Sequence, residues 1–98
     1  MWYNSLMNII TSKSNNGIKK VKKLHQKKYR TDSYLIEGWH LYEEAVNHQA
    51  PIEQVFVLEE FVDKIKIDAK VSIVSPEVLA EISDSKSPQG IVAEVKIN

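Results

Sequence analysis

Apolar strand-like runs alternate with helical patterns along this chain, and this alternation limits the possible folds more than any other feature. Residues 55 to 58 form a continuous apolar run, which is typical of a strand in a sheet covered on both faces. Strands are predicted at residues 33–37, 52–58, 70–74 and 90–97. Helical segments are predicted at residues 17 to about 28, 39–50, 59–65 and 76–82. This order predicts an α/β protein, a three-layer α/β/α sandwich around a four-stranded mixed sheet that is mostly parallel.

Charge is divided unequally along the chain. Residues 13 to 30 carry seven lysines and Arg30 without a single acidic residue, whereas all 13 acidic residues follow. The net charge of +0 therefore hides a basic first third and an acidic remainder. Such asymmetry indicates a polyanionic partner that contacts one face of the molecule.

Length and composition set the remaining bounds. The 98 residues are enough for one core, with residues 1–8 as an apolar N-terminal extension and residues 9–98 as the domain. The absence of cysteine excludes a disulfide framework and a thiolate site, and fits a reducing compartment. Neither a membrane-spanning run nor a signal peptide is present, so we expect a cytoplasmic protein that does not contact membranes.

The basic stretch itself shows helical spacing. Ile18, Val21 and Leu24 recur every three positions, with His25 and Lys28 continuing the same stripe. The other lysines cover the rest of the circumference, where they repel one another unless counterions or a bound polyanion neutralise them. The helix start can be capped by the side chain of any of three polar residues, namely Ser14, Asn15 and Asn16.

Three ordered groups of residues carry a resemblance to a known family. The first is Ile10-Thr11-Ser12, Asn16-x-Ile18-Lys19-x-Val21-x-x-Leu24 and Lys28-x-Arg30. The second is Leu35-Ile36-Glu37-Gly38-x-His40-Leu41-x-x-Glu44-Ala45, and the third is Ser83-Asp84-x-x-Ser87-Pro88-Gln89-Gly90-Ile91-Val92-Ala93. Over residues 9 to 96 they resemble the N-terminal substrate-binding domain of the SpoU (TrmH-like) RNA 2′-O-ribose methyltransferases. The chain departs from the family pattern at Gly17, where proline is usual, and at Tyr29, where glycine is frequent.

The resemblance implies a fold like that of the kink-turn-binding ribosomal proteins and a role in binding structured rRNA or tRNA. It also implies a C-terminal methyltransferase domain that holds S-adenosylmethionine and carries a catalytic arginine, for which these 98 residues have no counterpart. We therefore expect this chain to be part of a longer RNA methyltransferase. On its own it should have no catalytic residue, cofactor site or metal site.

Six residues of the basic stretch are predicted to contact RNA. Lysine ammonium groups suit phosphate oxygens as point charges, and an arginine can bind a phosphate or a guanine edge through two hydrogen bonds. The predicted contacts are Asn16, Lys19, Lys23, Lys27, Lys28 and Arg30. A solvated helical face is the simpler reading of a charge run, but the lack of any acid and the resemblance favour RNA binding.

Other conspicuous residues are predicted to be structural or to face the second domain. Glu37 could pair with Arg30 or cap the helix that follows. The remainder are Gly38 and the type I turn residues Pro88, Gln89 and Gly90. The three histidines lack the spacing of a metal site. Trp39 and Tyr29 could stack on bases, although a place in the core or at its rim is more usual for aromatic residues.

Two alternative functions remain open from the sequence. The chain could be a stand-alone RNA-binding or ribosome-associated protein of the same fold. It could also be a protein-interaction or oligomerisation module in which the apolar residues 1–8 support a homodimer.

Overall fold

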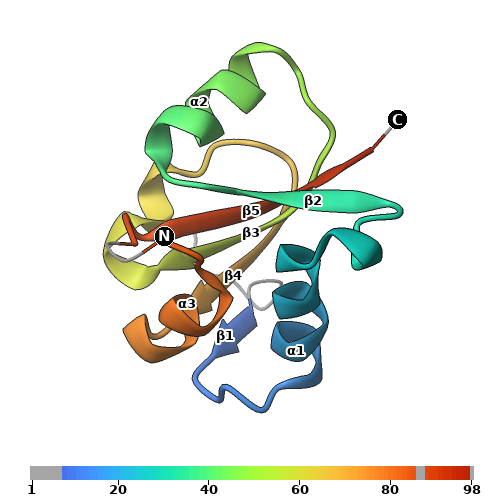
Figure 1. Ribbon diagram of the computed structural model, residues 1–98. Helices are drawn as coiled ribbons and strands as arrows, with labels where there is room; N and C mark the ends of the chain where they lie inside the picture. Colours follow the sequence, from blue (N-terminus) through green and yellow to red (C-terminus); the bar gives the residue numbers. More distant parts are fainter. Residues whose placement is uncertain (1–7, 86–87, 98) are drawn as a thin grey trace.

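The computed structural model describes residues 8–85 and 88–97, which form a five-stranded sheet with helices on both faces (Figure 1). The strands are β1 (Asn8–Ile10), β2 (Ser33–Glu37), β3 (Ile52–Leu58), β4 (Lys70–Val74) and β5 (Ile91–Lys96). The α-helices are α1 (Asn16–Lys22), α2 (Trp39–Asn47) and α3 (Pro76–Ile82). Three 3₁₀ helices complete the fold: η1 (Lys23–His25), η2 (Lys27–Tyr29) and η3 (Glu59–Lys64). The predicted α/β class is confirmed.

The strand order is β1-β4-β3-β5-β2, with β1 and β3 parallel to β4 and with β5 antiparallel to both β3 and β2. The prediction of four strands was wrong, because β1 is a run of three residues that becomes a strand only by pairing with β4. The predicted mixed, mostly parallel sheet is confirmed: among the described strands, β1 to β4 point the same way and β5 runs in the opposite direction. Strand β5 begins beside the end of β3, where the N–H of Leu58 donates to the carbonyl of Gly90 (3.1 Å), and then runs back along β3.

Each face of the sheet has its own core. On the side of α1 and α3, Ile18, Val21 and Ile82 pack against Phe56 of β3. On the side of α2 and η3, the buried residues include Tyr42, Val55, Val57, Val62 and Ile91. The central strand β3 is therefore buried on both faces, as its apolar run predicts. Figure 1 shows α2 above the sheet and α1 and α3 below it.

None of the helices in the described ranges has the length and apolar content needed to cross a lipid bilayer.

Candidate nucleic-acid interface

The basic segment, residues 16–30, begins with a capped helix anchored to the core. The Asn15 side chain accepts hydrogen bonds from the backbone N–H groups of Gly17 (2.8 Å) and Ile18 (3.2 Å), so Asn15 is the cap among the three candidates. Ile18 and Val21 are buried, whereas Lys19 and Lys20 of α1 are exposed. The first turn thus anchors the helix while its charged face stays accessible.

The basic segment is not one continuous helix, contrary to the prediction. Helix α1 ends at Lys22, η1 follows, and Gln26 is extended (φ −98°, ψ 124°) before η2. The Arg30 guanidinium donates to the carbonyl oxygens of Leu24 (Nε, 2.6 Å) and His25 (Nη2, 2.7 Å). A continuing α-helix would need both oxygens for its own N–H groups, so the side chain of Arg30 replaces the next helical turn. Lys28 is consequently exposed and does not continue the buried stripe.

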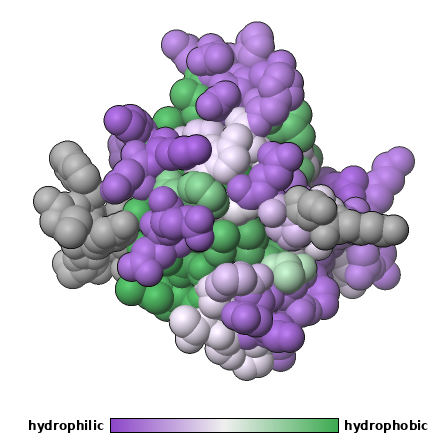
Figure 2. All heavy atoms as spheres, turned by 90° about the vertical axis from the view of Figure 1, so that its left-hand side faces the viewer, coloured by the Kyte–Doolittle hydropathy of each residue, from purple (hydrophilic) through white to green (hydrophobic). Residues whose placement is uncertain are grey.

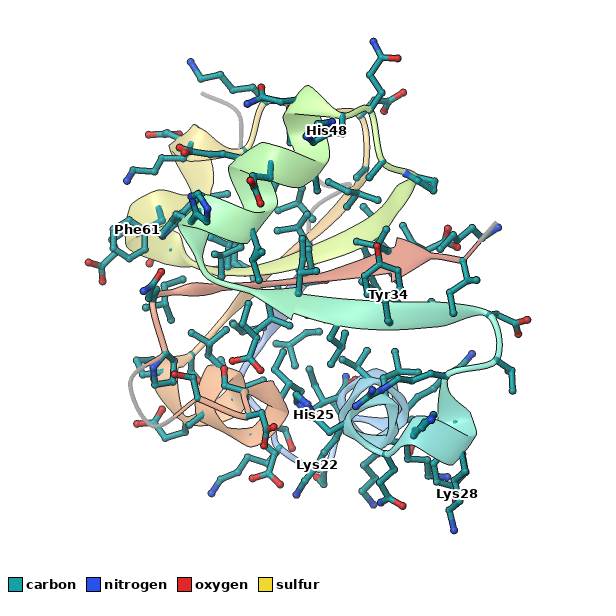
Figure 3. The ribbon with its side chains drawn as sticks, turned by 45° about the horizontal axis from the view of Figure 1, so that its top comes forward. Lys22, His25, Lys28, Tyr34, His48 and Phe61 are labelled. Atoms are coloured by element: carbon teal, nitrogen blue, oxygen red, sulfur yellow. The ribbon has the colours of Figure 1, made fainter. Side chains whose placement is uncertain are left out.

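Two contacts fix the basic segment against α3. The His25 ring bonds through Nε2 to the carbonyl oxygen of Ile82 at 2.6 Å, which makes this nitrogen the donor. Lys22 forms an ion pair with Glu81, and the hydrogen bond and charge of Lys22 hold the pKa of that carboxyl below its usual value. Figure 3 shows Lys22 and His25 between α1 and α3, with Lys28 on the far side of the segment.

The predicted RNA contacts lie together on this segment and are exposed. They are Asn16, Lys19, Lys23, Lys27, Lys28 and Arg30. Lys22 is the only cation of residues 13–30 that pairs with an acidic side chain within the described ranges. The predicted contacts did not include Lys20, although it is also exposed on α1. The ammonium groups of Lys23 and Lys28 lie 5.6 and 5.2 Å from the centre of the Tyr29 ring.

The predicted structural residues form a second cluster, which we call the Glu37–Gln89 junction. The Glu37 carboxylate accepts the backbone N–H groups of Asp84 (2.7 Å) and Ser85 (3.3 Å). It therefore neither pairs with Arg30 nor caps α2. The backbone N–H of Trp39 donates to Gln89 Oε1 (3.3 Å), and its indole Nε1 donates to the Gln89 carbonyl oxygen (2.9 Å).

The two glycines of this junction, Gly38 and Gly90, allow neighbouring segments of the chain to approach each other closely. Gly38 (φ +93°) and Gly90 (φ +97°) occupy backbone conformations that favour glycine. The N–H of Gly38 donates to the carbonyl of Ile91 (3.1 Å), and the N–H of Leu58 donates to that of Gly90 (3.1 Å). Pro88 is exposed in the same turn. Figure 2 views this end of the molecule and shows apolar side chains gathered in the middle of the face, with hydrophilic ones around them.

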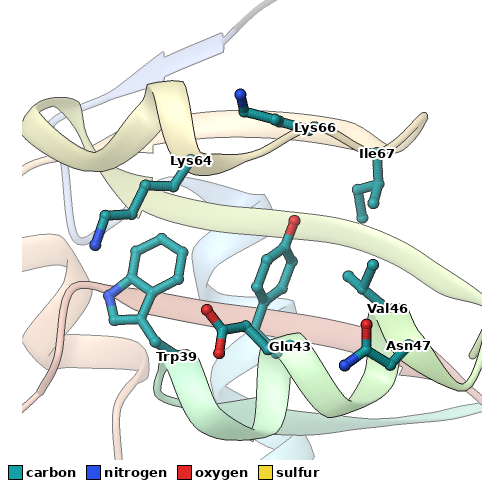
Figure 4. A pocket seen from close by; sticks show the side chains of 8 residues that line it. Trp39, Glu43, Val46, Asn47, Lys64, Lys66 and Ile67 are labelled. Atoms are coloured by element: carbon teal, nitrogen blue, oxygen red, sulfur yellow. The ribbon is translucent and has the colours of Figure 1, made fainter.

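A hollow of about 460 Å³ lies on the α2 face, on the opposite side of the sheet from α1 (Figure 4). Trp39 stands at one side of it, packed edge-on against Tyr42 and Phe61, with the Lys64 ammonium 4.9 Å from its ring centre. Burial raises the pKa of the Tyr42 hydroxyl, and the backbone N–H of Lys66 partly offsets this. The Trp39 ring is thus engaged within the fold. No cluster of three His, Cys, Asp or Glu side chains suited to a metal occurs in the part of the chain that the structure describes.

Known proteins resemble this chain in sequence and in fold. A family model for the MRM3-like substrate binding domain matches residues 15–93. The chain belongs to this family. It is 34% identical over 93 residues to 23S rRNA (guanosine(2553)-2′-O)-methyltransferase RlmP of Bacillus subtilis (strain 168), a match that covers 89% of this chain and 37% of that protein. The resemblance to SpoU-type methyltransferases is thereby confirmed.

Solved structures agree with the MRM3-like assignment. An RNA 2′-O ribose methyltransferase superposes with a TM-score of 0.79 at 28% identity, covering 92% of this chain and 38% of that one. An AdoMet-bound rRNA methyltransferase from Sinorhizobium meliloti shares the fold, with a TM-score of 0.80 at 24% identity, covering 96% of this chain and 38% of that one. The MRM3-like domain therefore spans less than two fifths of each of these relatives.

Proposed function

We propose that this chain recognises RNA for an S-adenosylmethionine-dependent rRNA 2′-O-ribose methyltransferase. The single observation that carries the proposal is the basic segment, which is acid-free, anchored by Ile18 and Val21, and exposed on its lysine face. The relative from Bacillus subtilis is named for methylation of 23S rRNA, which supports rRNA as the substrate. The domain holds structured RNA while a catalytic domain reaches a ribose 2′-hydroxyl.

The chemistry of the basic segment suits a phosphate backbone. Lysines 19, 23, 27 and 28 offer mobile point charges that can follow successive phosphates. Arg30 has five N–H donors, of which the backbone uses two, so three remain for a phosphate or a base edge. Asn16 adds an exposed amide at the start of α1. One rigid segment thus presents several phosphate ligands side by side.

The three glycines of this chain do not form the glycine-rich loop expected to bind S-adenosylmethionine in the catalytic domain. Gly17 lies within α1, Gly38 faces the Gln89 side chain, and Gly90 is packed against Phe61. The three glycines therefore lie in separate local settings and do not make a glycine-rich loop. We assign the cofactor and the chemical step to the catalytic domain.

We place the attachment of that catalytic domain after β5. The N–H of Ile97, just after β5, donates to the carbonyl of Asp32 (2.8 Å), two residues beyond the end of the basic segment. A domain joined there lies next to bound RNA. The Glu37–Gln89 junction sits at the other end of β5, and its apolar surroundings in Figure 2 offer a second contact surface.

Binding of deproteinised 23S rRNA fragments and of tRNA, titrated at several salt concentrations, tests the proposal. A triple variant of α1, η1 and η2 carries Lys19→Ala, Lys23→Ala and Lys27→Ala. It should bind more weakly, and its salt slope should fall by about 1 for each lysine that contacts a phosphate. Tighter binding of the rRNA fragments than of tRNA supports rRNA as the substrate.

A charge-matched control separates the basic segment from general attraction to polyanions. The control variant carries Lys64→Ala, Lys66→Ala and Lys70→Ala, all outside that segment. It should keep the affinity and salt slope of the unmodified chain. Equal losses in both triple variants, or no loss in either, would contradict the proposed RNA face.

A further inference from the structure

Tyr29 is an exposed aromatic residue within the basic segment. Tyr29 is 41% exposed, and the ammonium groups of Lys23 and Lys28 lie 5.6 and 5.2 Å from its ring centre. Trp39 and Tyr42, by contrast, pack against one another on the other face of the sheet. Tyr29 therefore presents an accessible aromatic ring beside two lysine ammonium groups, which can attract the phosphates of a nucleic acid.

The backbone around Tyr29 is held in place rather than left as a loose loop. Its N–H donates to the carbonyl of Gln26 (3.0 Å), and the N–H of Arg30 donates to that of Lys27 (3.0 Å). The Arg30 side chain then ties the same turn to Leu24 and His25. Because this backbone is already ordered, little backbone freedom is lost when the ring of Tyr29 binds a partner, which favours its use as a contact surface.

We propose that Tyr29 is a stacking platform for an unpaired RNA base, and that Lys23 and Lys28 bind the flanking phosphates. This inference rests on the proposed function and names the kind of nucleotide that the basic segment takes. Every base has an aromatic face, so a single tyrosine can hold an unpaired base of any sequence. A base inside a duplex has its faces covered by its neighbours and cannot use the ring.

The two lysines do not block this use of Tyr29. An exposed contact between an ammonium and an aromatic ring is weaker than the stacking of a base on the same ring. The lysine stems are flexible, and a phosphate oxygen is a stronger partner for an ammonium than a neutral ring is. Arrival of a nucleotide therefore moves the ammonium groups from the ring to the phosphates and frees the ring for the base.

The test compares two RNA probes with equal numbers of phosphates. One is a hairpin whose loop contains unpaired adenines, one of them replaced by 2-aminopurine, and the other is a fully paired duplex. Tyr29→Leu should weaken hairpin binding by roughly 5- to 140-fold and leave duplex binding and both salt slopes unchanged. Tyr29→Phe should keep both the affinity and the quenching of 2-aminopurine fluorescence, because it retains the ring.

Tyr34 supplies the matched control. It is 39% exposed on β2, and the described part of the chain places no lysine or arginine over its ring. Tyr34→Leu should bind both probes as the unmodified chain does. If the unmodified chain binds both probes and Tyr29→Leu loses nothing on the hairpin, the stacking proposal fails while RNA binding stands. If the unmodified chain binds neither probe, both proposals fail.

Discussion

At the residue scale, Gly90 shows how one missing side chain fixes the packing of two elements. A Cβ built on Gly90 would lie 2.7 Å from both Cδ2 and Cε2 of the Phe61 ring, and its φ of +97° favours glycine. The phenyl ring cannot retreat easily, because Phe61 packs edge-on against Trp39. The start of β5 and the position of η3 therefore depend on each other.

Gly90→Ala should lower the free energy of unfolding by about 2–4 kcal/mol, combining backbone strain with overpacking against Phe61. Gly17→Ala is the matched control, since Gly17 lies within α1 and its added Cβ would meet the Asn15 Oδ1 at 3.1 Å. That control should change stability by less than about 1 kcal/mol. Urea unfolding measures both, and equal stabilities for the two variants would contradict the packing described for Phe61.

The sequence predicts a structural or interdomain role for the residues of the Glu37–Gln89 junction, but it does not predict their hydrogen-bond partners. A strand that ends in Glu-Gly and a Pro-Gln-Gly turn both indicate sharp bends from the sequence alone. The acceptor role of Glu37 depends on where Asp84 and Ser85 lie, 47 and 48 residues further along the chain. Such a contact is set by the tertiary fold and has no local signal.

At the element scale, the basic segment keeps the helical period over a range where the helix itself does not continue. Ile18 and Val21 predict α1 correctly. Beyond Lys22, repulsion between the lysines disfavours a regular helix, and the Arg30 side chain takes the carbonyl oxygens of Leu24 and His25. The spacing of apolar residues gives no sign that the Arg30 side chain will bond to carbonyl oxygens five and six residues before it. The predicted helix was therefore too long.

Arg30→Lys tests this capping role while keeping the charge. A lysine cannot reproduce the planar pair of hydrogen bonds, so the turns of η1 and η2 should open more often. Amide hydrogen exchange at Gln26, Tyr29 and Arg30 should become faster, and the salt slope of RNA binding should stay the same. The position-30 amide can be followed in the lysine variant as well.

Lys28→Ala is the companion variant for the Arg30 experiment. It removes a charge from η2 without touching either capped carbonyl, because Lys28 is exposed and its ammonium lies near Tyr29. Its amide exchange should match the unmodified chain, while its salt slope falls. The capping role would be refuted by exchange rates in Arg30→Lys that stay at their original values.

At the scale of the whole molecule, helices cover both faces of the sheet, but the two faces of the edge strand β1 are covered unequally. The alternation of strands and helices predicted helices on both faces, and both cores confirm this. The edge strand β1 could not be predicted, because three residues have no detectable period. Its Ile10 is half-buried and packs on the α1 and α3 side, whereas Ile9 is 73% exposed.

This unequal cover of β1 predicts different losses of stability for its two neighbouring isoleucines. Ile10→Ala should lower the free energy of unfolding by about 1–3 kcal/mol, less than for a fully buried isoleucine because Ile10 is only half-buried. Ile9→Ala should change it by less than about 0.5 kcal/mol, as expected for an exposed site. Both variants keep the backbone pairing of β1 with β4, so urea unfolding compares only their side chains. A larger loss for Ile9→Ala than for Ile10→Ala would mean that the sheet edge is covered from the α2 face instead.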